Sequence, residues 1–147
     1  MTRAGILRRV ATLLPLPVLG AAIAWVLTFN PTDSTPDPGG PCPWHRLLGI
    51  DGPGCGGTRM FWYLLHGDLI DAARHHLAAL VAVPFLLYGY AAWIALAWFG
   101  RQLPMPAPLT RARLIVGYLA AFALYSVVLR NLPWSPFSWF YVPDLTP

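Results

Sequence analysis

The sequence predicts an all-α membrane protein with three transmembrane helices, because it holds three long apolar stretches and few charges. Hydrophobic residues make up 56% of the 147 residues and charged residues 11%, against about 45–50% and about 25% in soluble domains. The stretches at 10–29, 77–99 and 114–130 are long enough to cross a hydrocarbon layer of roughly 30 Å. A chain of this length has room for one domain, so 1–147 is expected to form a single membrane domain.

The first stretch, residues 10–29, follows three arginines, which favours a cytoplasmic N-terminus. Pro15 and Pro17 lie inside it and should kink the helix. The basic start and the small residues Ala22 and Ala24 also fit a cleaved signal peptide. Because the apolar run continues to Phe29 without a polar break, a retained membrane anchor is the expectation.

Residues 30–57 are expected to form an exoplasmic loop, because prolines and glycines interrupt both helix and strand throughout it. In its first part, Asp33 and Asp37 are interpreted as solvated turn residues. Residues 58–76 are expected to form two interfacial helices. Thr58 is a candidate N-cap for a short apolar helix over 60–65, which is too short to span and either lies on the bilayer or enters it and returns.

Gly67 should end that short helix, and Asp68 can cap the next one. The second span, 77–99, contains no charge, and the turn at 100–113 is expected in the cytoplasm because of its arginines. The third span, 114–130, is short, which suggests either little tilt or snorkelling of the arginines at both ends, Arg113 and Arg130. The tail, 131–147, forms either an exoplasmic interfacial belt or a lid over the central segment, with aromatic residues Trp134, Phe137, Trp139, Phe140 and Tyr141.

The polar segment between the first two spans carries a recurring pattern of motif residues. They are Cys42, Pro43, Pro53, Gly54, Cys55, Gly56, Thr58, Arg59, Gly67, Asp68 and Ala72. The pattern resembles the domain of unknown function 2752 family, whose members are small bacterial integral membrane proteins with no assigned activity. In that family a CPGC sequence and an Asn-Pro pair are usual. Here Gly52 stands at the first cysteine of CPGC, and His76-Leu77 replaces Asn-Pro, which weakens any inference of a thioredoxin-like redox pair.

Cys42 and Cys55 are the only cysteines, and several states remain open for them. A structural disulfide would close a loop of about 14 residues and stabilise it by roughly 3 kcal/mol. The alternatives are two unpaired packed cysteines, a zinc site with His45 and one of His66, His75 or His76, or a thiol nucleophile beside His45. The spacing lacks a CxxC motif, and we predict no metal and no cofactor.

Arg59 flanks the apolar run at a depth where an unpaired charge is costly. It is predicted to pair with Asp68 or Asp71 and so fix the helical turn. The alternative is that Arg59 contacts a substrate anion or a lipid headgroup.

The expected function is that of a scaffold or accessory protein in a bacterial cell membrane. Its cysteine- and glycine-rich loop would contact a partner membrane protein, a second copy of the chain, or lipid. The alternative is a thiol/disulfide redox or metal-binding protein that uses Cys42 and Cys55, although no catalytic residues are indicated. Nucleic-acid binding is not expected, because the arginines are not clustered with stacking aromatic residues. A transporter is disfavoured because the spans carry no charge at mid-helix.

Overall fold

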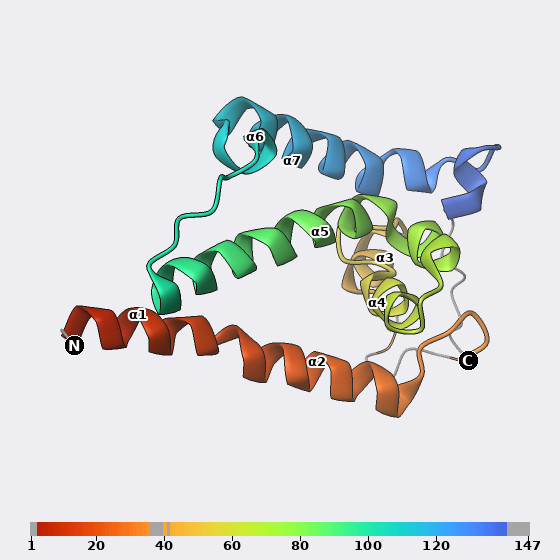
Figure 1. Cartoon of the computed structure of the whole chain (residues 1–147). Coiled ribbons are helices and arrows are strands. Elements are labelled where there is room, and N and C mark those ends of the chain that lie inside the picture. The colour runs from red at the N-terminus through yellow and green to blue at the C-terminus, as the bar shows by residue number, and fades with distance from the viewer. Residues whose placement is uncertain (1–2, 36–39, 41, 141–147) are drawn as a thin grey trace.

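The computed structural model describes residues 3–35, 40 and 42–140, and within these it contains helices and connecting turns but no strand. Three helical segments are long and apolar enough to cross a membrane, namely Gly5–Phe29, Leu69–Phe99 and Ala112–Asn131. The predicted fold class, all-α with three candidate spans, is therefore confirmed. Figure 1 shows the middle span lying between the other two.

The first span is broken into α1 (Arg3–Leu13) and α2 (Pro15–Phe29). Pro15 and Pro17 have no N–H to donate, so the ladder of backbone hydrogen bonds is interrupted where the sequence predicts a kink. Leu14 closes the break with a tighter bond to the Ala11 carbonyl at 3.3 Å. The helix also begins earlier than residue 10, so it includes the basic N-terminal residues.

Two short helices lie between the first and second spans: α3 (Pro43–Leu48) and α4 (Gly57–Leu65). Helix α3 occupies a segment that we expected to be loop. Proline is tolerated in the first turn of a helix, and Gly49 ends α3 in the left-handed conformation. Helix α4 begins before Thr58, with Gly56 as its N-cap (φ 77°) and no side-chain cap.

Helix α5 (Leu69–Phe99) begins as expected at Asp68, whose Oδ1 accepts a hydrogen bond from the Asp71 N–H at 3.1 Å. The helix is kinked at His76, where φ is −161° and ψ is 75°. This kink separates a short initial segment from the long apolar part. Pro84 lies within the apolar part without ending the helix.

The chain then forms α6 (Ala107–Thr110), α7 (Ala112–Val127) and two 3-10 turns, η1 (Leu129–Asn131) and η2 (Phe137–Phe140). Helix α6 lies in a connection predicted only as a turn. Turn η2 packs against η1 and α5. The aromatic Tyr141 lies outside the described residues.

The molecule has two distinct ends (Figure 1). At the arginine-rich end are the start of α1, the end of α5 and α6, and at the cysteine end are α3, α4, η1 and η2. Within the spans, only 11%, 6% and 6% of the most apolar windows are buried inside the chain. Most of their apolar surface is therefore available to lipid or to other apolar helices, as expected for a membrane protein.

Candidate functional site

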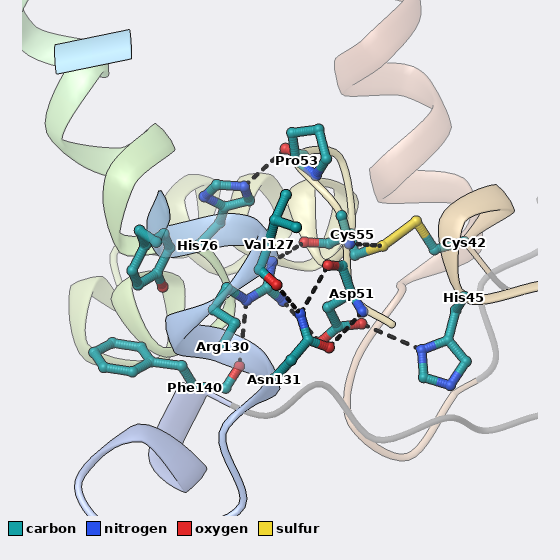
Figure 2. Close-up of polar contacts among 12 residues, drawn as sticks. Cys42, His45, Asp51, Pro53, Cys55, His76, Val127, Arg130, Asn131 and Phe140 are labelled. Atoms are coloured by element: carbon teal, nitrogen blue, oxygen red, sulfur yellow. Dashed lines mark hydrogen bonds and ion pairs between the residues drawn. A yellow bond between two sulfur atoms is a disulfide. The ribbon is translucent and has the colours of Figure 1, made fainter. Parts of the chain in front are cut away.

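A buried polar cluster at the cysteine end is the most organised group of side chains in the described structure. At its centre, Arg130 is only 1% exposed. Its Nη1 donates to the Cys55 carbonyl at 2.7 Å, and its Nη2 lies 3.6 Å from Asp51 Oδ2. Its Nε also contacts the Phe140 carbonyl at 3.5 Å. The snorkelling suggested for Arg130 is thus wrong, because buried carbonyl and carboxylate oxygens take the place of water (Figure 2).

Asn131 fixes the same loop through its backbone. Its Oδ1 accepts from the Asp51 N–H at 2.7 Å, and its Nδ2 donates to the Asp51 carbonyl at 3.0 Å. The same Nδ2 donates to the Val127 carbonyl at 3.0 Å, so the amide also ties down the end of α7. Through these bonds the third span holds the cysteine loop in one place.

The loop itself is closed by a disulfide between Cys42 and Cys55, with Cα atoms 5.5 Å apart. Cys55 is buried, and its Sγ accepts from the Gly52 N–H at 3.1 Å. A Cβ added at Gly52 would lie 2.3 Å from Cγ of Trp44. A side chain at this position therefore requires Trp44 to move.

His76 caps the long apolar part of α5. Its Nδ1 accepts from the Ala79 N–H at 3.2 Å, as an asparagine N-cap would. Its Nε2 then carries the proton and donates to the Pro53 carbonyl at 2.9 Å. The next residue, Leu77, has an N–H that proline would lack, and this N–H donates to the Tyr125 hydroxyl at 3.2 Å. The His76-Leu77 pair therefore starts this part of the helix with its ring nitrogens and the Leu77 N–H hydrogen-bonded.

The comparison with known protein families finds a match in this loop and the helices after it. Residues 42–90 match the family model Protein of unknown function (DUF2752). The resemblance stated from the motif is thereby confirmed, over a third of the chain. No curated protein and no solved structure matches the chain. The DUF2752 match includes α3, α4 and the first part of α5, whereas Arg130 and Asn131 lie beyond it.

A second polar contact joins the turn after α2 to the DUF2752 segment. Asp33 lies in a turn, as expected, but its side chain is only 31% exposed, and Arg74 Nη1 donates to its Oδ2 at 2.7 Å. Asp37 lies outside the described residues. His75 is fully buried, with its Nε2 2.9 Å from Asp33 Oδ1 but not aligned for a hydrogen bond. The His75 ring stacks on Tyr63, with centroids 5.2 Å apart. Burial, followed by the nearby Asp33 carboxylate, raises the pKa of Tyr63.

His45 and His66 are the remaining histidines considered for a zinc site. His45 Nδ1 is 3.4 Å from Asp51 Oδ1, at the edge of the buried polar cluster. His66 is exposed at the end of α4, where it stacks on Trp62 with centroids 3.9 Å apart. In the part of the chain that the structure describes, no three histidine, cysteine or aspartate side chains are arranged to hold a metal ion.

Two of the motif residues, Arg59 and Gly67, lie near the start of α4 and just after its end. Arg59 is 5% exposed near the start of α4, whereas Asp68 follows the far end of that helix. The six residue-to-residue steps from Arg59 to Leu65 rise roughly 9 Å along the axis. The pairing of Arg59 with Asp68 or Asp71 stays a prediction. Gly67 adopts φ 78°, which lets the chain reverse between α4 and α5.

Sequence reasoning did not find Asn131, Tyr125 or Trp44 as parts of this site. The available signals were weak. Asn131 follows the last apolar stretch as an ordinary loop residue, and Tyr125 is one of several tyrosines within a span. Trp44 lies in a segment whose prolines and glycines predict a loop, so the sequence gives no sign that its side chain packs on Gly52.

Proposed function

We propose that this protein is a small accessory protein of a bacterial cell membrane whose cysteine loop docks a partner membrane protein. In the proposed orientation the arginine-rich end is cytoplasmic and the cysteine end is exoplasmic, following the positive-inside rule. The arginines at the N-terminus and around α6 support this orientation.

The observation that carries the proposal is the exposed apolar face of α3. Trp44, Leu47 and Leu48 are 43%, 82% and 59% exposed. Aromatic and aliphatic anchors of this kind are typical of the centre of a protein interface. They lie on a helix of six residues that is marginal by itself.

The loop around α3 is held by covalent and polar contacts, which supports a docking role. The Cys42–Cys55 disulfide fixes the start of α3, and Asp51, bound by Asn131, fixes the segment after it. A surface that is already ordered loses less entropy when a partner binds. Most polar groups of the buried cluster are hydrogen-bonded to one another, and Arg130 Nη2, which makes no hydrogen bond, lies 3.6 Å from Asp51 Oδ2. These internal contacts favour a supporting role over catalysis.

The alternative function is thiol/disulfide exchange, and one observation favours it. Cys42 is half-buried while Cys55 is buried, and a reactive cysteine must be partly exposed. In exchange, the thiolate of a partner thiol would attack Cys42 Sγ and form a mixed disulfide with Cys42, and Cys55 would leave as a thiolate. The Gly52 N–H, which donates to Cys55 Sγ, would stabilise that thiolate.

Site-specific photo-crosslinking in native membranes tests the docking proposal. A photoreactive residue at Leu47 is expected to form a discrete crosslinked protein species, whereas one at Leu119, an exposed position of α7, serves as the control. Crosslinks from Leu47 to lipid alone, or the same products from both positions, would contradict docking of a partner protein. Retention of the Leu47 crosslink after both cysteines are replaced would show that the disulfide does not support the surface.

A further inference from the structure

The arginine-rich end contains an apolar groove that the proposed docking function does not use. The groove lies between the α1–α2 junction and the last turns of α5, and its volume is about 380 Å³. This volume is near the lower end of the 300–1,000 Å³ typical of small-molecule sites. It is lined mainly by apolar side chains, namely Leu13, Leu16, Ile94, Trp98 and Phe99, together with Thr12 and Tyr90.

The few polar atoms in the groove wall are already bonded to one another. The Tyr90 hydroxyl donates to the Thr12 carbonyl at 2.7 Å, and Trp98 Nε1 donates to Thr12 Oγ1 at 3.0 Å. Thr12 Oγ1 in turn donates to the Arg9 carbonyl at 2.7 Å. The wall therefore offers an apolar surface within two candidate spans, which suits a hydrocarbon chain better than a polar ligand.

A fixed positive charge stands one helical turn before this groove. Arg9 Nε donates to the Ala97 carbonyl at 3.3 Å, and Arg9 Nη2 to the Trp98 carbonyl at 3.5 Å. The Arg9 guanidinium also lies over the Trp98 ring, 5.4 Å from its centroid. A guanidinium has five N–H donors, and these two contacts leave others for an anion.

Among the residues that the structure describes, no acidic residue lies at the arginine-rich end to neutralise it. The sequence places no aspartate before residue 33 or between residues 72 and 143, and it contains no glutamate. Six arginines therefore share this end without a carboxylate in the same part of the sequence, at positions 3, 8, 9, 101, 111 and 113. Anionic lipid headgroups are the counter-charge available at a membrane surface.

We propose that this groove binds an anionic glycerophospholipid, with one acyl chain against Ile94 and Trp98 and the headgroup phosphate at Arg9. The apolar wall selects a lipid, and the unneutralised guanidinium selects the anionic headgroup. This site lies at the opposite end of the molecule from α3, so it is independent of the docking proposal.

Native mass spectrometry of the detergent-purified full chain tests the proposal, with dioleoylphosphatidylglycerol and dioleoylphosphatidylcholine added in equal amounts. The wild type is expected to retain the anionic lipid preferentially. Arg9→Gln should lower that preference about fivefold, since one arginine near a membrane surface contributes about that factor. The matched control is Arg8→Gln, which removes an exposed arginine next to Arg9 and should change the preference less than twofold.

A second pair of variants tests the groove rather than the charge. Ile94→Trp should fill it and abolish lipid retention, whereas Leu86→Trp enlarges an exposed side chain of the same helix outside the groove and should retain lipid. Equal losses in Arg9→Gln and Arg8→Gln would indicate diffuse surface charge and overturn the site. Retention by Ile94→Trp, or equal retention of both lipids by the wild type, would overturn it too. If Arg9→Gln does not fold, the comparison of Ile94→Trp with Leu86→Trp decides the outcome.

Discussion

Replacing Arg130 by methionine should unfold the cysteine end more readily than any surface arginine change. Methionine keeps much of the side-chain volume but removes the short bond from Nη1 to the Cys55 carbonyl and the charge beside Asp51. A hydrogen bond from a charged donor contributes about 1.5–3 kcal/mol, and removing one partner of a buried ion pair costs about 3–5 kcal/mol. The ion-pair contact with Asp51 is 3.6 Å long and the hydrogen bond to the Phe140 carbonyl is 3.5 Å long, so we expect a loss of about 3 kcal/mol.

The measurement is the free energy of unfolding in detergent micelles, followed by circular dichroism as denaturant is added. Arg46→Met is the matched control, because Arg46 is exposed on α3, and it should change stability by less than about 0.5 kcal/mol. Adding Asp51→Asn to Arg130→Met should recover about 1 kcal/mol or more, because the carboxylate left without its partner is then neutral. Equal stability of Arg130→Met and Arg46→Met would refute the role assigned to Arg130.

Three other substitutions address the loop and the kink. Cys42→Ser and Cys55→Ser should destabilise the protein equally, by roughly 3 kcal/mol, and reduction of the wild type should match them; unequal unfolding energies would argue against the bond. His76→Asn should preserve the helix start, whereas His76→Ala should lose about 1–2 kcal/mol with the cap; equal thermal stability of the two variants would contradict capping. Gly52→Ala should be destabilising because its Cβ meets Trp44, and Trp44→Ala in the same chain should relieve it; a stable Gly52→Ala single variant would contradict this contact.

The spans were predictable because lipid imposes a simple requirement on sequence. About 20 apolar residues are needed to cross it, and the three stretches stand out from their surroundings. Prolines 15 and 17 predicted the break between α1 and α2 by the absence of their N–H groups. The start of α5 was also predictable, because Asp68 is followed three residues later by the N–H that it accepts.

The buried polar cluster was not predictable, because it depends on contacts between distant parts of the chain. Arg130 and Cys55 are 75 residues apart, and Asn131 and Asp51 are 80 apart. Hydrophobic periodicity gives no information about which loop an arginine at a helix end will meet. Helix α3 was missed for a local reason, since its six residues lie between glycine- and proline-rich segments and give too short a pattern.

The proposed topology is tested most directly by labelling intact cells with a membrane-impermeant maleimide, before and after mild reduction. The account predicts that Cys42 and Cys55 react only after reduction, and that they do so without lysis of the cells. Labelling without reductant would show free thiols, and labelling only after lysis would place the cysteine end in the cytoplasm. Either result would contradict a disulfide-closed docking loop on the outer face of the membrane.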